Sequence, residues 1–600
     1  METHPYELNA LKHSQDMLSE TIMPMSPLQW LIGSLLLVIM IVSGTRLVYQ
    51  ANNRVLIDMP RDGGTYTEGI VGTPRFINPL LAISNADRDL TAVVYAGLMK
   101  RDNKNVLLPE LAESYSISDD GTTYTFILKQ GLLFHDGTPL TASDVVYTVT
   151  QAAHTAIRSP LYANWEGVGV EEINERTVTF TLPEPYAPFI ENTTIGILPK
   201  HIWAPLADDQ FSFSQFNVEP IGAGPYRITR VVVDKSGIPE RYELAAYDSY
   251  TLGKPHIANF HFYLYRDKAD AFSAFTRGTI DALYGLDPQS IEELLQNDTT
   301  HDLSILRAPQ LRVFGVFFNQ SQQPLFIQKT VREALNEATP KQAIVGEILK
   351  GYGTVLSAPV PPHLLTELSE NSNTLDTEVN TTETSSISDG EHIERARKIL
   401  EDAGWTRNAS DQVYELTQND KTLRLAFTLS TTDTPELATT AERVAKAWRE
   451  VGAQVEVKVF NANDLTQSAI RPRKYDALLF GLELGHELDL YAFWHSSQRN
   501  DPGLNISQFV DIEADAALTA LRTSNKPDER LEYLKAFLSR VEHERAGIFI
   551  YAPNFTYLMR TKPHNTTLHP IAIPSERFDT VHEWHIETDR VWPIVKNLLD

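Results

Sequence analysis

Two stretches near the C-terminal end carry side chains that could form a catalytic or metal site. The first, His582-Glu583-Trp584-His585, combines two histidines with a glutamate, the residue types of a zinc protease helix. In such a helix the histidines stand four residues apart, so that both reach the metal from one face. Here they stand three residues apart. We therefore predict a surface turn rather than a metal site.

The second stretch, His495-Ser496-Ser497, places two hydroxyl groups beside a base, the pairing that activates a serine nucleophile. Neighbouring residues in a sequence rarely align as nucleophile and base. The chain also lacks the Gly-x-Ser-x-Gly elbow that presents a nucleophilic serine in many hydrolases. We therefore do not expect catalysis at this stretch.

The remaining polar patterns are weak as metal or cofactor sites. The glycines of residues 221–227 (IGAGPYR) lack the Lys-Ser/Thr pair that follows a phosphate-binding loop. His201 stands beside Lys200 and Trp203, a setting typical of a structural histidine. The chain has no cysteine, which excludes disulfides, cysteine nucleophiles and cysteine-ligated metals. We expect no metal, no cofactor and no enzymatic activity.

Ligand binding explains these residues better than catalysis. The acids Asp476, Glu483, Glu487 and Asp489 form a loose set without the spacing of a metal-binding loop. The net charge of −26 argues against nucleic acid as a partner. It also argues against tight binding to an anionic lipid surface.

The elements that would position such a site follow from periodicity. A chain of 600 residues is expected to form two or three domains. Alternating apolar residues predict strands at 423–429, 455–459 and 475–481, and helical spacing predicts helices over 393–403 and 437–451. A strand, helix and strand at this spacing indicate a parallel βαβ unit. Residues 371–390 lack periodicity and are predicted to be a disordered surface insertion.

The segment 111–148 (LAESYSISDDGTTYTFILKQGLLFHDGTPLTASDVVYT) has the clearest local structure. The apolar residues Tyr124, Phe126 and Leu128 alternate with Thr123, Thr125 and Lys129, which predicts a half-buried strand. Asp136-Gly137 predicts a tight turn, because glycine tolerates positive φ and aspartate bonds to its own backbone. Thr141 and Asp144 have the spacing of a helix capping box.

The N-terminal region contains an apolar segment long enough to span a membrane. Residues 21–45 carry no charge, and Trp30 to Val42 is almost wholly apolar. A signal peptide is the alternative, but residues 1–20 hold four acids against Lys12, and no clear cleavage site follows. We favour an uncleaved anchor. Arg46, Arg54 and Arg61 follow the span, so the positive-inside tendency alone would place the large domain in the cytoplasm.

The segment 111–148 is similar, nearly residue for residue, to the signature segment of the family 5 extracellular solute-binding proteins. These are the oligopeptide-, dipeptide- and nickel-binding components of ABC importers. Three further stretches resemble family motifs: ILPKHIW at 197–203, IGAGPYR at 221–227 and FWHSSQRNDPGLN at 493–505. The resemblance covers residues 63–600, interrupted at 371–390. The signature residues are Glu113, Asp120, Gly121, Phe126, Phe134, His135, Asp136, Gly137, Thr141, Asp144 and Val145.

The resemblance implies an α/β, periplasmic-binding-protein-like fold of two lobes with an extra subdomain, preceded by one N-terminal transmembrane helix. The implied boundaries are a tail at 1–27, an anchor at 28–48, a linker at 49–62, lobe I at 63–84, 196–310 and 550–600, the extra subdomain at 85–195, and lobe II at 311–549. The signature segment falls in the subdomain and is not expected to contact ligand.

The resemblance also implies where a ligand binds. Phe76 and Asn78 lie on a loop that reaches the cleft in family members, and Asn319 ends a strand that crosses between the lobes. Glu483 is the acid nearest to the position that binds a peptide amine, although Asp489 aligns with another family acid. Trp494 would wall or stack on the ligand, and His495 would contact it. We expect all six to bind ligand: Phe76, Asn78, Asn319, Glu483, Trp494 and His495.

The expected function is capture of peptides or similar small solutes outside the cytoplasm, by hinge closure, and their delivery to the permease of an ABC importer. The protein is expected to be a monomer anchored in the cell membrane. One alternative is a ligand sensor or chaperone-like protein with the same fold. A hydrolase is a further alternative, which would predict turnover of a peptide or ester.

Overall fold

The computed structural model describes residues 26–297, 303–365, 388–418 and 421–592, in two units. One unit comprises residues 1–61 and 587–600, and the other comprises Asp62–Ile586. In the first unit, helix α2 (Pro27–Val55) precedes strand β1 (Ile57–Arg61), which pairs antiparallel with β23 (Glu587–Val591). The apolar part of α2, Pro27–Leu47, is long and apolar enough to cross a membrane, and a signal sequence would have the same features.

The segment predicted as a polar linker, 49–62, forms regular structure. The last turns of α2 run to Val55, and β1 follows. Neither glycine nor proline occurs between Thr45 and Met59, so no residue there breaks the helix. The strand depends on a partner more than 500 residues away in the sequence, which local patterns cannot reveal.

The unit Asp62–Ile586 is built on one twelve-stranded mixed sheet. Its order is β20-β19-β21-β14-β22-β12-β2-β11-β10-β9, and β13 and β15 also pair with β22. We call β2 and β9–β12 the first half of the sheet, and β14 and β19–β21 the second half. The strands are β2 (Gly63–Val71), β9 (Tyr226–Val233), β10 (Pro239–Ala246), β11 (Ile257–Tyr265), β12 (Ala282–Tyr284), β13 (Ser304–Pro309), β14 (Arg312–Phe318), β15 (Gly353–Val355), β19 (Ala426–Thr432), β20 (Gln454–Phe460), β21 (Ala477–Glu483) and β22 (Gly547–Met559).

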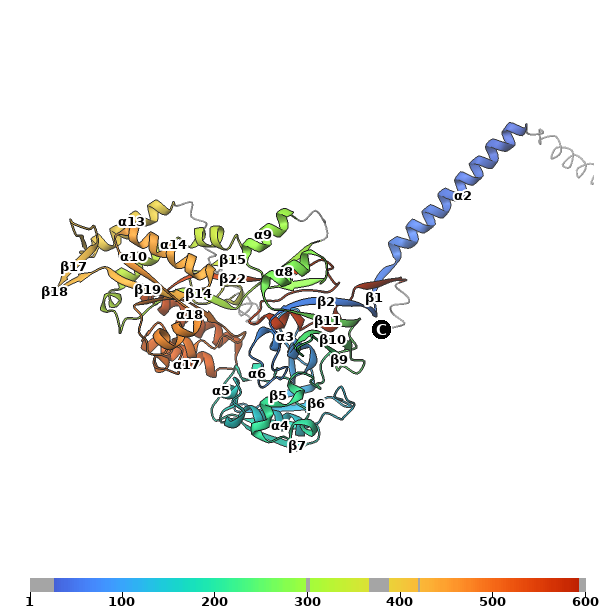
Figure 1. Cartoon of the computed structure of the whole chain (residues 1–600), viewed down its shortest axis with the longest axis horizontal. Coiled ribbons are helices and arrows are strands. Elements are labelled where there is room, and N and C mark those ends of the chain that lie inside the picture. Colours follow the sequence, from blue (N-terminus) through green and yellow to red (C-terminus); the bar gives the residue numbers. More distant parts are fainter. Residues whose placement is uncertain (1–25, 298–302, 366–387, 419–420, 593–600) are drawn as a thin grey trace, which may run out of the picture. The chain divides into compact units, whose positions relative to one another are not determined.

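Strand β22 joins the two halves. Its residues 547–551 pair with β14 of the second half, and its residues 557–559 pair with β12 of the first half. Figure 1 shows β14 and β22 between the later helices, coloured yellow to orange, and the elements around β2 and β11. The two halves are therefore connected by continuous backbone hydrogen bonding near β22.

The second half contains the predicted parallel βαβ unit. Strands β19 and β20 pair in parallel and are joined by α14 (Pro435–Val451). Trp448 of α14 is fully buried, and its indole N–H donates to the Leu335 carbonyl of α10 (Lys329–Glu337). Helix α13 (Asp389–Asp402) is capped by Ser388. The insertion predicted at 371–390 is therefore wrong at residues 388–390, which form the start of α13, and residues 371–387 lie outside the described part.

A separate four-stranded sheet contains the segment that was best defined by sequence. Its order is β5 (Ala112–Ile117), β6 (Thr123–Leu128), β8 (Thr177–Thr181) and β7 (Gly169–Asn174). Tyr124, Phe126 and Leu128 are buried, as the alternation predicts. Gly137 has a φ of 85° in the predicted turn, and Asp144 accepts a hydrogen bond from the Thr141 backbone at the start of α4 (Ala142–Ala152).

A buried ion cluster ties together distant parts of the first half. Arg577 of η8 (Pro574–Phe578) contacts Glu68 of β2 at 2.6 Å and Asp89 of α3 (Asn85–Val94) at 2.7 Å, and all three side chains are fully buried. The hydroxyl of Tyr557 donates to Glu68, and that of Tyr284 donates to Asp89. Every charge in this cluster is thus paired and hydrogen-bonded, as burial requires.

Replacing Arg577 with methionine should leave two buried carboxylates without their cation. We expect Arg577→Met to lower the free energy of unfolding by about 3–5 kcal/mol, measured by urea denaturation of the full chain in detergent. The control is Arg395→Met, because Arg395 is exposed and lies 3.9 Å from Glu337. The control should cost less than about 1 kcal/mol. Equal losses in the two variants would contradict the role given to the cluster.

Candidate functional site

A cavity of about 580 Å³ lies where the two halves of the sheet meet. The first half and its helices contribute Arg88, Lys268 and Tyr284, and the second half contributes Arg312 and Glu483. Strand β22 lines it with Tyr551, Pro553, Asn554, Phe555 and Thr556. A pocket of this size with apolar walls and a few polar groups fits a small organic ligand.

Aromatic rings form much of the cavity wall. The rings of Phe314 and Tyr551 stack with centroids 5.0 Å apart, across neighbouring strands β14 and β22. Gly481 of β21 permits this arrangement, since a Cβ there would lie 2.7 Å from the Phe314 ring. Phe480 and Tyr352 add further aromatic surface. These rings offer flat apolar faces for ligand side chains.

Charged side chains of both signs line the same cavity. The guanidinium of Arg312 lies 2.8 Å from the carboxylate of Glu483, and both side chains are substantially exposed. Burial raises the pKa of Glu436 at the start of α14, Lys268 opposes the rise, and Asp287 adds to it. A zwitterionic ligand could therefore find both a cation and an acid on the walls.

Glu483 is the one predicted ligand residue that lines this cavity. Asn78 is fully buried, donates to the Asn217 side chain and accepts from the Leu80 N–H. Asn319 is also fully buried, with its amide donating to the Arg473 carbonyl. The side-chain amides of both asparagines are therefore hydrogen-bonded to other residues of the protein.

The three remaining predicted residues lie away from the cavity lining. Phe76 packs partly buried against the core of the first half. Trp494 is 1% exposed and packs against Phe317, Phe509, Phe537 and Phe549. His495 stacks on Tyr491 with ring centroids 4.1 Å apart. The structure does not bring the six predicted residues together.

The structure does pair His495 with Ser497. The Ser497 hydroxyl lies 2.8 Å from His495 Nδ1, which also accepts the Ser497 backbone N–H at 3.1 Å. This geometry is a local cap of the short helix Ser496–Gln498. Neither residue lines the cavity between the two halves. The serine and the base of this pair therefore lie outside the lining of that cavity.

The other histidine stretch is not the surface turn that the sequence predicted. Trp584 is fully buried against Tyr66, Tyr557 and Phe578, and beside it His585 is buried and His582 is partly buried. An aromatic residue inside a polar turn was the signal for this burial.

Sequence reasoning missed Arg312, Glu436 and the aromatic residues of β22. Arg312 begins an otherwise apolar strand, and such an isolated charge was a usable signal. Glu436 lies in the first turn of α14, just beyond the carboxyl end of parallel strand β19, where ligand sites of α/β sheets commonly lie. The aromatic wall had no local signal, because β22 reads as an ordinary buried strand.

Comparison with known proteins agrees with this architecture. Residues 106–501 match the sequence pattern of the bacterial extracellular solute-binding proteins, family 5. The chain belongs to this family. The oligopeptide-binding protein AppA of Bacillus subtilis is 27% identical over 525 residues, which cover 85% of this chain and 90% of AppA. The Escherichia coli dipeptide-binding protein is 23% identical over 525 residues, 83% of this chain and 89% of that protein.

Solved structures of the family share the fold of this solute-binding protein. AppA from Bacillus subtilis in complex with a nonapeptide gives a TM-score of 0.66 at 25% identity, covering 88% of this chain and all of AppA. NikZ from Campylobacter jejuni in complex with Ni(L-His) gives a TM-score of 0.66 at 26% identity over the same shares. The predicted two-lobe α/β fold is confirmed, and one apolar N-terminal helix is present.

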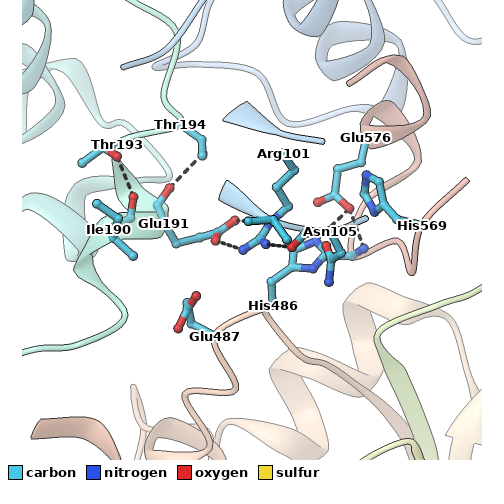
Figure 2. A network of polar contacts seen from close by, with 12 residues as sticks. Arg101, Asn105, Ile190, Glu191, Thr193, Thr194, His486, Glu487, His569 and Glu576 are labelled. Atoms are coloured by element: carbon cyan, nitrogen blue, oxygen red, sulfur yellow. Dashed lines mark hydrogen bonds and ion pairs between the residues drawn. The ribbon is translucent and has the colours of Figure 1, made fainter. Parts of the chain in front are cut away.

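A second polar cluster of this solute-binding protein lies where residues after β21 contact the first half (Figure 2). His486 Nε2 lies 3.0 Å from the carboxyl of Glu576, and Arg101 pairs with Glu191 beside them. Burial and the charge of Asp579 raise the pKa of Glu576 to about 8, while burial and Arg101 lower the pKa of His486 to about 4. Both shifts favour the neutral form of the group, so this buried contact does not require an unpaired charge.

Glu576 should make stability depend on pH in a defined window. Its pKa is raised from the usual 4.5 to about 8, so the folded state keeps a proton that the unfolded chain releases. The free energy of unfolding therefore decreases as the pH rises from about 4.5 to about 8, by up to about 1.4 kcal/mol per pH unit. Glu576→Gln cannot titrate, so its melting temperature should fall less than that of wild type between pH 6.5 and 8.

Between pH 6.5 and 8, the titration of Glu576 can also be distinguished from that of the neighbouring histidines. The lowered pKa of His486 affects stability only below about pH 6.5. Burial lowers the pKa of His569, but its hydrogen bond and charge contact with Asp579 outweigh this and raise the pKa. The contact with Asp579 is present in both proteins, whereas the charge of Glu576 also raises the His569 pKa, and this contribution is lost in Glu576→Gln and belongs to the measured difference. Parallel melting curves for the two proteins across this window would contradict the assignment.

Proposed function

We propose that this solute-binding protein captures peptides in the cavity between the two halves of its sheet and passes them to the permease of an ABC importer. The observation that carries the proposal is the cavity of about 580 Å³, whose walls come from both halves and include aromatic rings and charges of both signs. AppA, a relative of similar length, binds oligopeptides, which supports peptides as the ligand class.

Hinge closure is the proposed mechanism. The two halves meet at β14 and β22, so rotation about these strands opens or closes the cavity while the remainder of each half moves as a body. Closure would remove water from the Arg312–Glu483 pair, which is otherwise substantially exposed. Desolvation strengthens charged contacts to a ligand. The lobe and subdomain boundaries predicted from the sequence remain predictions.

Glu483 is the proposed partner of the ligand amine. Its carboxylate lines the cavity at the end of β21, and its contact with Arg312 fixes its direction. An ammonium group approaching this carboxylate would form a charge-assisted hydrogen bond. For Phe76, Asn78, Asn319, Trp494 and His495, an effect on ligand binding remains a prediction, and their contacts support an indirect effect through the fold.

The proposed location is outside the cytoplasm, with α2 as an uncleaved anchor in the cell membrane. The family is extracellular and the helix is long and apolar enough, which supports this placement. Removal of the helix as a signal sequence is the alternative. We further propose that the protein acts as a monomer without nucleic acid and without catalytic activity.

Two other functions share this fold or site. A sensor or chaperone-like protein would bind peptides equally well but would have no cognate permease, so genes for two permeases and two ATPases beside this one would favour the importer. A hydrolase is favoured only by the Ser497–His495 contact. Recovery of bound peptide with unchanged mass after incubation would contradict hydrolysis.

Native mass spectrometry of the full chain, purified in detergent from a peptide-rich lysate, tests the proposal. We expect short peptides of defined length bound at about one per chain. Protein that never carries peptide, even after incubation with a peptide mixture, would contradict peptide capture.

A variant pair tests the amine site. Wild-type protein should prefer peptides with a free amino terminus over acetylated ones, and Glu483→Gln should lose most of this preference, as measured by competitive capture. Glu532→Gln is the control, because Glu532 is an exposed acid on α18 (Pro527–Glu544). If the preference survives in Glu483→Gln and is lost in Glu436→Gln, the amine binds at the other acid.

A further inference from the structure

A second cavity of about 430 Å³ adjoins the first. Arg88 and Ile573 line both cavities, so these two residues stand at the junction. The second cavity has apolar walls from Met99, Leu161 and Ile195. A ligand bound in the first cavity could therefore extend past Arg88 into a chamber that the proposed peptide site does not use.

Arg88 is held on a rigid support. It lies in the first half of helix α3, whose start is fixed by a capping box between Ser84 and Asp87. The next residue, Asp89, is bound to Arg577 and Tyr284 in the buried ion cluster. The Arg88 backbone is thus fixed on both sides, so only its side chain loses conformational freedom when it binds a ligand.

The guanidinium of Arg88 has no hydrogen bond or ion pair within the part of the chain that the structure describes, although Arg88 is half-buried. The acids beside it on α3 cannot neutralise it. Asp87 accepts from the backbone N–H groups of Arg75, Phe76 and Ser84. Asp89 is already paired with Arg577. Arg88 therefore presents free donors and an uncompensated positive charge.

The other charges around the second cavity are matched. Lys100 lies 3.6 Å from Glu110, and Arg101 pairs with Glu191. Asp579 lies 3.2 Å from His569. Glu576 bonds to His486 in the contact described above (Figure 2). Among the described residues that line the second cavity, Arg88 is thus the one charge without a partner, and an anionic group of the ligand would neutralise it.

We propose that the two cavities form one binding site in which Arg88 binds a carboxylate of the ligand. The inference rests on the proposed peptide function and extends it: the amine lies at Glu483 in the first cavity, and the carboxylate end reaches the junction. A guanidinium binds a carboxylate through two parallel hydrogen bonds, which gives selectivity for an acid over a neutral amide. Peptides with a carboxylate at this position are therefore the preferred ligand class.

Competitive capture from a defined pool tests the inference. The pool contains tripeptides to pentapeptides, each with a free or an amidated carboxyl terminus, with and without one acidic side chain. Full-length wild type, Arg88→Gln and Arg88→Lys are incubated with it, and bound peptides are quantified by mass spectrometry. Arg395→Gln is the control, because Arg395 is an exposed arginine on α13.

Wild type and the control should enrich carboxylate-bearing peptides over their amides by at least about tenfold. Arg88→Gln should bring this ratio close to one while still capturing the amides, and Arg88→Lys should give an intermediate ratio. If the protein prefers peptides with a free carboxyl terminus over the same peptides with an amidated one, Arg88 binds the terminal carboxylate. If it prefers amidated peptides with an acidic side chain over amidated peptides without one, Arg88 binds the side-chain carboxylate.

Four results would decide against the inference or its basis. If Arg88→Gln captures carboxylate-bearing and amidated peptides in the same ratio as wild type, the role of Arg88 is overturned. A ratio near one in wild type overturns it as well. Capture of no peptide by wild type contradicts the proposed peptide function itself. If Arg88→Gln does not fold, Arg88→Lys decides, and a ratio equal to that of wild type overturns bidentate recognition.

Discussion

The buried contact of Arg577 with Glu68 and Asp89 is the constraint on which the site depends. It joins the first strand of the large unit, its first helix and a segment near its C-terminal end. Asp89 and Arg88 are neighbours on α3, and Tyr284, which donates to Asp89, lines the large cavity. A buried charge left without its partner is costly, so these segments must fold together. The ion cluster thereby fixes the positions of two residues of the cavity wall, Arg88 and Tyr284.

Strand β22 supplies the complementary element, because it belongs to both halves of the sheet. Residues that line the cavity come from its middle, between the part paired with β14 and the part paired with β12. Movement about this strand would change the cavity without breaking either core. The His486–Glu576 contact lies across the same junction and links the two halves through a buried hydrogen bond.

Local patterns predicted many of the elements, whereas the ligand-binding role of the predicted site residues remains a prediction. The alternation in β6, the turn at Gly137 and the unit β19–α14–β20 follow from short-range periodicity and glycine geometry. Asn78 and Asn319 look like ligand contacts in sequence, yet their amides are consumed by buried hydrogen bonds that only the folded chain reveals. Arg88 escaped notice because the absence of a partner is a property of three-dimensional structure. Pairings such as β1 with β23 are likewise beyond any local window.

One ligand is proposed to lie between Glu483 and Arg88 in the cavity formed by both halves. A crystal structure of the chain with a peptide that it has captured would show whether it does. We expect peptide density in the large cavity, with the amine within hydrogen-bonding distance of Glu483 and a carboxylate on the Arg88 guanidinium. Peptide bound elsewhere, or bound in the cavity with neither contact, would contradict it.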